Sequence, residues 1–280
     1  MGEITVELVK ELREETNLGM MECKKALVDA GGDKQKAVRL LRERGMLVAQ
    51  KKATRAANQG LVASFIKPDG KAGSLVEVNC ETDFVARNST FVDFVNGLAV
   101  KACGSDASLA ESERNDLVAL VAKLGENMVI KRNGRFFLSG AGTVASYIHL
   151  GGKIGVLVEA GCGNDATVQN PAFKDAVRDV AMHIAASSPS YLNKEAVPAD
   201  VVASEREICA KQVQGKPANI IEKIVDGKIK KFYSDVCLVD QGFVKDPKQT
   251  VTQYLEGVGK GIGDQITVRR FLRYQVGQKE

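Results

Sequence analysis

A repeat at a constant offset of 82 residues limits the folds of this 280-residue chain more than any other feature. Residues 60–105 align with residues 142–187 without a gap, and 19 of the 46 positions are identical. The matches include Val62-Ala63-Ser64 with Val144-Ala145-Ser146, Leu75-Val76-Glu77 with Leu157-Val158-Glu159, and Cys80 with Cys162. Self-similarity on this scale predicts two related subdomains, here named copy one and copy two.

Both copies show the same order of local patterns. A β-rich run (61–67, 143–149) is followed by a glycine-containing turn and a second β-rich run (73–80, 154–161), and a helix begins near Asn88 or Asn170. Further strands are predicted at 135–138 for copy one and at 236–239 and 266–276 for copy two. Two short strands backed by a helix predict an α+β fold with small antiparallel sheets, each covered on one face.

The first 54 residues predict a separate unit of three helices. Helical spacing of apolar residues covers 4–14 and 20–30, and a third helix begins after Asp33 and ends near Gly45. Three short helices bury little surface, so this unit needs a neighbouring domain or a partner. Met20 and Met21 lie beside the first loop, where either core packing or contact with a partner accounts for them. The basic segment 49–58 is interpreted as a tether or a solvated helix end.

A helical hairpin is inserted into copy two. Residues 198–213 and 218–232 are compatible with helices, and the turn sequence Gln214-Gly215-Lys216-Pro217 separates them. Apolar positions for an intramolecular contact are Ile208, Val213, Ile220, Ile221, Ile224 and Ile229. The segment has no counterpart in copy one, and two interpretations remain open: an arm for a partner or dimer, or packing onto the core.

The copies differ directly after their shared cysteine. Copy one continues with ETDFVARN at 81–88, whereas copy two continues with GNDATVQN at 163–170. Both contain an aspartate, which indicates a turn or cap required by the shared fold. Phe84 is replaced by Ala166, so a large ring is present in one copy only. Either copy one packs around this ring, or the ring points outward to a partner.

Composition argues against several kinds of active site. Only two histidines and no tryptophan are present, and no two cysteines have the CxxC spacing of a zinc ribbon. The glycine cluster 257–263 fits neither the P-loop nor the GxGxxG pattern, and we interpret it as a flexible turn before the last strand. A chain of this size buries its own core, so the six cysteines are expected as free thiols in a reducing compartment.

Charge and hydropathy suggest which partners to expect. The net charge is only +4, and no signal peptide or apolar run of about 18 residues is found, so we expect a cytoplasmic protein without membrane or direct nucleic-acid contacts. An RNA-binding, translation-associated protein is the alternative, and it would use Lys51, Lys52, Arg55, Arg269, Arg270 and Arg273.

The motif TDFVARN at 82–88, preceded by VEVNCE, resembles the core motif of the bacterial elongation factor Ts family. TNLGMMECKKAL at 16–27 is similar to the opening segment of that family. The resemblance implies a guanine nucleotide exchange factor for the GTPase elongation factor Tu, acting by protein–protein binding without covalent chemistry or a cofactor. It further implies a ubiquitin-associated-like docking domain at 1–54 and core subdomains at 55–141 and 142–280, with the hairpin at about 198–232.

The resemblance also implies which residues act. Asp83 and Phe84 would enter the GTPase near its Mg²⁺ and phosphate site, with Thr82 and Val85 positioning them. Partner-binding residues elsewhere would be Met20, Met21 and Lys24 in the docking domain and His149 in copy two. A homodimer or a 2:2 assembly through the hairpin is a further expectation. Some family members continue into a C-terminal helix, and no contact of that kind is expected for a chain ending at Glu280.

Overall fold

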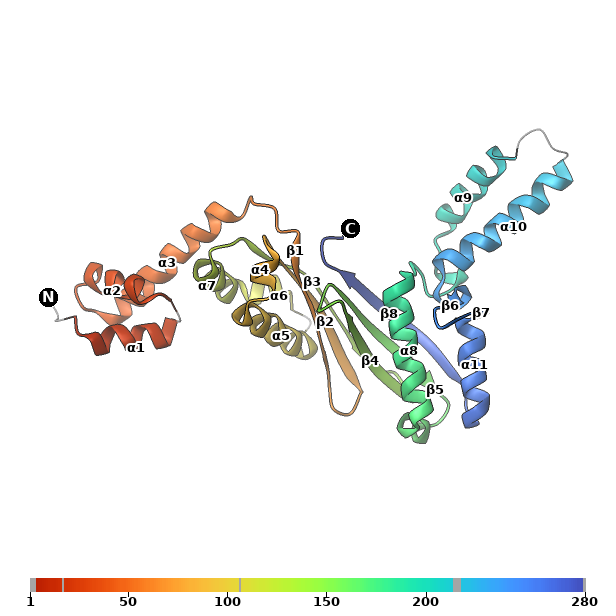
Figure 1. Cartoon of the computed structure of the whole chain (residues 1–280), viewed down its shortest axis with the longest axis horizontal. Coiled ribbons are helices and arrows are strands. Elements are labelled where there is room, and N and C mark those ends of the chain that lie inside the picture. The colour runs from red at the N-terminus through yellow and green to blue at the C-terminus, as the bar shows by residue number, and fades with distance from the viewer. Residues whose placement is uncertain (1–3, 17, 106, 214–217, 279–280) are drawn as a thin grey trace. The chain divides into compact units, whose positions relative to one another are not determined.

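The computed structural model describes residues 4–16, 18–105, 107–213 and 218–278 (Figure 1). The fold is α+β, as predicted, and the chain divides into two compact units. Unit 1 contains residues 1–62, 76–133 and 275–280, and unit 2 contains residues 63–75 and 134–274.

Three helices form the N-terminal part of unit 1: α1 (Val6–Thr16), α2 (Met20–Asp29) and α3 (Lys34–Lys52). The Asp33 carboxylate caps α3 by accepting a hydrogen bond from the Lys36 N–H at 3.0 Å. The prediction that this helix ends near Gly45 is wrong. Gly45 is buried against α7, where a Cβ would lie 3.7 Å from both Val118 and Ala122, and this packing carries α3 on to Lys52.

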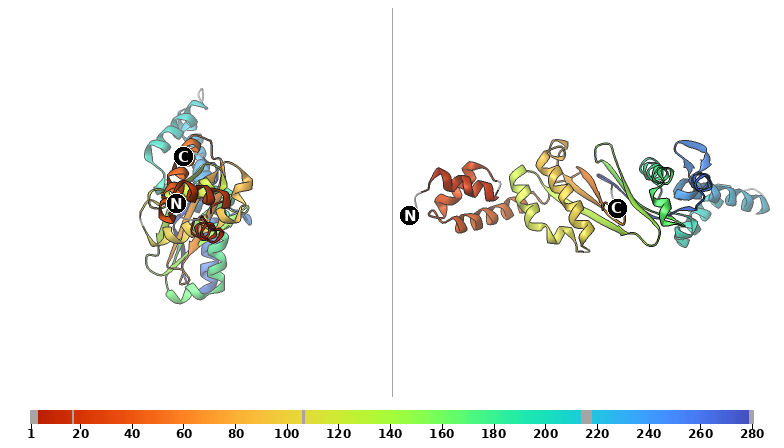
Figure 2. Two further views of the ribbon diagram at one scale, coloured as in Figure 1. Left: turned by 90° about the vertical axis from the view of Figure 1, so that its left-hand side faces the viewer. Right: turned by 90° about the horizontal axis from the view of Figure 1, so that it is seen from below.

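Unit 1 also holds most of the sheet β1-β2-β3, formed by β1 (Gln59–Ile66), β2 (Ala72–Cys80) and β3 (Met128–Phe137). All nine residues of the central strand β2 are buried. Helices α4 (Asp83–Ala86), α5 (Ser89–Gly104), α6 (Leu109–Ser112) and α7 (Arg114–Leu124) follow β2, and α5 lies on one face of the sheet (Figures 1 and 2). Strand β3 begins earlier than the predicted 135–138, because Met128 and Ile130 reach the core from a stretch rich in charged residues.

Unit 2 is built on the sheet β4-β5-β8, formed by β4 (Gly142–His149), β5 (Ile154–Cys162) and β8 (Ile266–Gln275). Strands β4 and β5 are antiparallel, with Gly142 opposite Gly161 and His149 opposite Ile154. The 3₁₀ turn η1 (Asp165–Gln169) leads into α8 (Pro171–Ser187), which packs on β4 and β5. β5 and α8 begin 82 residues after β2 and α5 (154 − 72 and 171 − 89), which is the offset of the sequence repeat.

Two predicted features of unit 2 are wrong. Residues 236–239 form no strand, because α10 (Ala218–Val236) ends there and the 3₁₀ turn η3 (Leu238–Asp240) follows. The glycine cluster is not a flexible turn, because it lies in and directly after α11 (Val251–Ile262). Gly259 lets the helix approach the chain that follows it, since a Cβ there would lie 2.5 Å from the Asp264 carbonyl oxygen. Gly263 ends α11 at φ +72°.

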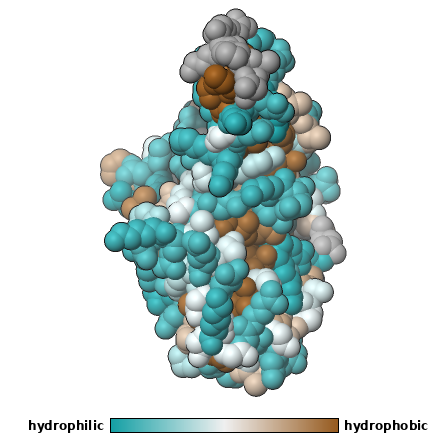
Figure 3. Space-filling view, turned by 90° about the vertical axis from the view of Figure 1, so that its right-hand side faces the viewer, coloured by the Kyte–Doolittle hydropathy of each residue, from teal (hydrophilic) through white to brown (hydrophobic). Residues whose placement is uncertain are grey.

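The inserted hairpin consists of α9 (Ala199–Lys211) and α10. The remaining short elements of unit 2 are η2 (Lys194–Ala196), β6 (Gly242–Phe243) and β7 (Asp246–Thr250). Cys209, Val225 and Ile229 form the buried contact between α9 and α10. Ile208 and Ile220 are exposed and lie outside this buried contact. The predicted turn 214–217 lies outside the described residues. Apolar surface is visible near the free end of the hairpin and in a hollow below it (Figure 3).

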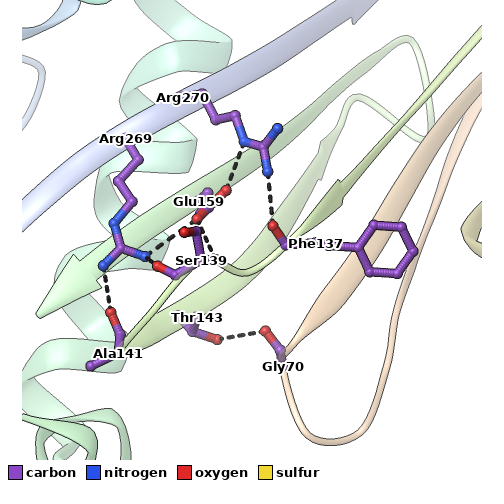
Figure 4. Close-up of polar contacts among 8 residues, drawn as sticks. All are labelled: Gly70, Phe137, Ser139, Ala141, Thr143, Glu159, Arg269 and Arg270. Atoms are coloured by element: carbon purple, nitrogen blue, oxygen red, sulfur yellow. Dashed lines mark hydrogen bonds and ion pairs between the residues drawn. The ribbon is translucent and has the colours of Figure 1, made fainter.

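Ion pairs around the buried Glu159 hold the segment that leads into β4 (Figure 4). The Glu159 carboxylate, on β5, accepts hydrogen bonds from the Ser139 N–H (3.0 Å), Arg269 (3.3 Å) and Arg270 (2.7 Å). Arg270 also donates to the Phe137 carbonyl oxygen, and Arg269 to that of Ala141. Burial alone would raise the pKa of Glu159, but these hydrogen bonds outweigh it and lower the pKa.

Candidate functional site

The loop after β2 presents an exposed aromatic ring on a short, capped helix. Thr82 precedes α4, and its Oγ1 accepts a hydrogen bond from the Val85 N–H at 3.3 Å. Ala86 is buried at the end of α4, whereas the Phe84 ring is 83% exposed. The hypothesis that this ring points outward is confirmed. We name residues 82–85 the exchange loop, after the role that the resemblance described above implies for them.

A residue distant in sequence supports the base of this loop. Thr82 Oγ1 donates to Glu126 Oε1 at 2.6 Å, and the Thr82 N–H donates to Glu126 Oε2 at 3.0 Å. The neighbours of these two residues are joined as well, because the Asn127 N–H donates to Glu81 Oε1 at 2.6 Å. The sequence pattern gives no sign of Glu126, because it lies 44 positions after Thr82 in the turn that follows α7.

The polar part of the exchange loop is more open. The Asp83 carboxylate lies in the first turn of α4 and forms an ion pair of 3.2 Å with Arg87, whose side chain is exposed. An exposed pair of this kind contributes little to stability and is readily broken by a partner. The loop therefore presents a carboxylate and an apolar ring on consecutive residues.

Copy two contains a loop of the same construction without the ring. Asp264 accepts hydrogen bonds from the backbone N–H groups of Gly163 (2.9 Å) and Asn164 (3.1 Å) and from the Thr167 hydroxyl. The hydrogen bond from Thr167 is the main reason that the pKa of Asp264 is lowered. Asp264 thus supports its loop as Glu126 supports the exchange loop, but Ala166 stands where copy one has Phe84.

Helix α2 has a buried face, and its exposed face carries two methionines among charged residues. Cys23, Ala26 and Leu27 belong to the core of the three-helix unit. Met20 and Met21 are both exposed, Met21 to 73%, and Lys24 is exposed as well. Core packing therefore does not account for these two methionines. The structure brings Met20, Met21 and Lys24 together on one helix, which we name the α2 surface.

His149 occupies the end of β4, where the chain turns into β5. Its ring stacks on Tyr147 with the centroids 5.8 Å apart, and its Nδ1 lies 3.1 Å from the Tyr147 hydroxyl oxygen. The imidazole is half-buried by this contact. The tyrosine therefore fixes the orientation of the histidine at the turn between β4 and β5.

The basic residues considered for RNA binding largely bind protein groups. Arg269 and Arg270 hold Glu159, and Arg273 donates to the Ala185 carbonyl oxygen on α8. Lys52 donates to the Gly125 carbonyl oxygen, and Arg55 forms an ion pair of 3.6 Å with Glu81. These contacts hold the guanidinium groups against their own chain.

The described residues hold neither a metal-ligand cluster nor a membrane span. No three His, Cys, Asp or Glu side chains in this part of the chain are grouped so that they could hold a metal ion. None of its helices is both long and apolar enough to cross a bilayer. All six cysteines are free thiols, and every one except Cys162 is buried.

Comparison with known proteins agrees with the motifs. Residues 81–278 match the family model described as elongation factor TS. The chain is 46% identical to the elongation factor Ts of Nautilia profundicola, in an alignment that covers 99% of this chain and 94% of that protein. It is 44% identical to the elongation factor Ts of Nitratidesulfovibrio vulgaris (98% and 96% covered) and to that of Clostridium kluyveri (98% and 93% covered). The exchange-loop motif, the matched family model and these near-complete alignments establish that the chain belongs to the elongation factor Ts family.

Proposed function

We propose that this chain releases GDP from elongation factor Tu by inserting Asp83 and Phe84 near the Mg²⁺ and phosphate site of that GTPase. Membership of the family makes the chain a guanine nucleotide exchange factor in translation elongation, and the exchange loop is the part that would perform the step. The action requires binding alone, without covalent chemistry.

The exposure of Phe84 is the observation that carries this proposal. A phenylalanine side chain gains about 1.5–3 kcal/mol when it leaves water, so an 83% exposed ring represents binding energy held available for a partner. The Thr82–Glu126 hydrogen bonds and the buried Ala86 hold the backbone that carries the ring in place before binding. A ring held in this way can push packed elements of the partner apart, because packed interiors switch between discrete arrangements rather than deforming continuously.

Thermodynamic linkage defines what the exchange loop must achieve. If the chain lowers the affinity of elongation factor Tu for GDP, then GDP must lower the affinity for this chain by the same factor. The Asp83 carboxylate can contribute to this coupling, since a negative charge near the bound phosphates competes with them for the same cation and donors.

Three other parts of the chain complete the proposal. The α2 surface at residues 20–24, within a docking domain at 1–54, would bind the GTPase and supply affinity. His149, in the second core subdomain at 142–280, would form a separate contact, while the subdomain at 55–141 carries the exchange loop. The hairpin, with Ile208 and Ile220 exposed on it, would support a homodimer or a 2:2 assembly. Light scattering of the chain with its partner measures that stoichiometry, and a strict 1:1 mass would contradict the assembly.

Replacing the ring tests the exchange step. Phe84→Ala should preserve the fold, because the ring is exposed, and should slow GDP release from elongation factor Tu by about tenfold or more, as expected for an aromatic anchor. Stopped-flow release of a fluorescent GDP analogue, at saturating concentrations of each variant, measures this rate. Val100→Ala is the matched control, since it shortens another exposed apolar side chain, on α5, and should leave the rate unchanged. An unchanged rate for Phe84→Ala would refute the role of the ring.

A further inference from the structure

A buried amide holds the segment that leads from α3 to β1. We name this segment, residues 53–58, the tether. The side chains of Ala53, Thr54 and Arg55 are exposed, so apolar burial does not fix this part of it. Its backbone is held instead, because Nδ2 of Asn127 donates to the Arg55 carbonyl oxygen at 2.7 Å and lies 3.5 Å from that of Ala53. The Asn127 side chain is only 5% exposed.

Asn127 belongs to the same turn that supports the exchange loop. This turn, residues 125–127, follows α7, and we name it the junction. Glu126 binds the exchange loop from the junction, and Asn127 binds the tether from it. Glu81, directly before the exchange loop, contacts both, since its Oε1 accepts the Asn127 N–H at 2.6 Å and lies 3.6 Å from Nη1 of Arg55. The tether and the base of the exchange loop are therefore held by the same few polar groups.

Copy two repeats the junction without the buried amide. The turn 263–265 follows α11 and begins with Gly263 at φ +72°, as the junction begins with Gly125 at φ +76°. Its aspartate supports the loop of copy two, as described above. The third residue differs, because Gln265 is exposed whereas Asn127 is buried. The three-helix unit precedes copy one only, so the buried amide occurs in the copy to which a further domain is joined.

Two attachments connect the three-helix unit to the junction. Gly45 packs α3 against α7, and the Lys52 side chain, at the end of α3, donates to the Gly125 carbonyl oxygen. Asn127 holds the chain after it has left the helix. A body fixed at one place can pivot, whereas fixation of both the helix and the chain that leaves it resists rotation about the end of α3.

We propose that Asn127 is a positioning residue that fixes the docking domain relative to the exchange loop, so that binding of the α2 surface also places Phe84 against elongation factor Tu. This inference rests on the proposed function. Two binding sites that are joined rigidly in a suitable geometry bind more tightly than the same sites on a flexible connection, because less freedom is lost when the second site engages. The amide thus makes affinity gained at the α2 surface available to the exchange loop.

Trypsin cleavage of the tether tests the physical connection. Cleavage after Arg55 requires the tether to leave its position, so Asn127→Ala should raise the rate at which fragment 1–55 appears by about threefold or more. Asn127→Asp keeps the shape and removes the donor, and it should act in the same way. Asn79→Ala is the matched control: Asn79 is equally buried, but its Nδ2 donates to the Gln59 carbonyl oxygen on β1, at 3.3 Å. The control should leave the rate within twofold of wild type, so general loss of stability is excluded as the cause.

A double-mutant cycle tests the connection to binding. Calorimetry measures the Kd for nucleotide-free elongation factor Tu of wild type, Asn127→Ala, the double variant Met20→Ser, Met21→Ser, and their combination. Asn127→Ala and the methionine variant should each raise the Kd about tenfold. Their combination should raise it by less than about thirtyfold, because a loosely joined docking domain contributes less that can be lost. A purely structural asparagine would multiply the two effects, as we expect for Asn79→Ala combined with the same methionine variant.

The outcomes distinguish this inference from the function on which it rests. If the wild-type chain neither binds nor accelerates GDP release, the proposed function fails. If it does both, three results would each overturn the inference alone: unchanged trypsin cleavage of the Asn127 variants, a Kd of Asn127→Ala within twofold of wild type, or a combined effect equal to or above the product of the single effects. Faster cleavage together with a combined effect below that product supports the role of Asn127.

Discussion

Single residues far apart in the chain decide how firmly Phe84 is held. Glu126 accepts both a hydroxyl and a backbone hydrogen bond from Thr82, and hydrogen bonds to a charged acceptor are stronger than neutral ones. Glu126 is therefore a positioning residue: it acts on the exchange loop through Thr82. Its contribution is separable from that of the ring.

Substitution of Glu126 tests this support. Glu126→Ala should lower the free energy of unfolding by about 1–3 kcal/mol, since it removes two hydrogen bonds to a charged group, and should slow GDP release although Phe84 is unchanged. Glu126→Gln keeps an acceptor oxygen and should restore part of the rate. Urea unfolding and GDP release measure the two effects. Glu111→Ala, at an exposed glutamate on α6, is the control, and a normal release rate for Glu126→Ala would contradict the positioning role.

Among the elements of unit 2, α8 is joined to the base of the hairpin through His183. Because the Val244 N–H can only donate, it requires His183 Nδ1 as an acceptor at 3.1 Å, so Nε2 carries the proton and donates to Gln241 Oε1 at 2.9 Å. Gln241 in turn donates to the Asp235 carbonyl oxygen near the end of α10. Burial lowers the pKa of His183 from its ordinary value of 6.5.

This connection predicts acid sensitivity. Below pH 6.5 the unfolded chain takes up a proton that the folded chain excludes. The free energy of unfolding therefore falls as the pH drops from 6.5 to the lowered pKa of the folded state, and this group causes no loss above pH 6.5. The slope is at most about 1.4 kcal/mol per pH unit. Urea unfolding measures the free energy of unfolding of wild type and of His183→Gln at about pH 7.5 and 5.5. The amount by which the wild-type value exceeds that of His183→Gln should be smaller at the lower pH. His149→Gln serves as the control, and a constant advantage of wild type over His183→Gln would contradict the linkage.

For the whole molecule, affinity and exchange are expected to reside in different parts. The α2 surface is exposed and unrelated to the exchange loop in sequence, so its loss should weaken binding without abolishing exchange at saturation. Deleting residues 1–54 would be an unsuitable test, because it removes the α3 residues that pack on α7, among them Gly45.

The double variant Met20→Ser, Met21→Ser tests this division. It should raise the Kd for elongation factor Tu about tenfold, leave the GDP release rate at saturation unchanged, and leave unfolding unchanged because both side chains are exposed. Calorimetry and stopped-flow fluorescence measure the first two. Val6→Ser, on the exposed side of α1, is the control. Undiminished affinity of the double variant would exclude the α2 surface as a docking site.

Local signals in the sequence predict the class of fold and the most exposed part of the site. Asp33, Asn88 and Asn170 each cap the helix predicted to begin after them, because capping depends only on side chain and backbone atoms two or three residues apart. The absence of Phe84 from copy two leaves two possibilities, a ring packed within copy one or a ring that points outward, and the 83% exposure of the ring in the structure decides for the second. The helix caps required no knowledge of long-range contacts.

Only the tertiary structure decided the features that depend on distant residues. Gly45 lies in a helix because it packs closely against α7, and the glycine-rich α11 is helical because it packs closely against the Asp264 backbone. In both helices this packing outweighs the low helix propensity of glycine. Glu126 joins the exchange loop, and Asn127 holds the tether, without any local pattern that marks them. Periodicity and capping act over a few residues, so the sequence alone determines where most elements begin. How far some of them extend, and which surfaces meet, is determined by packing between residues that are distant in the chain.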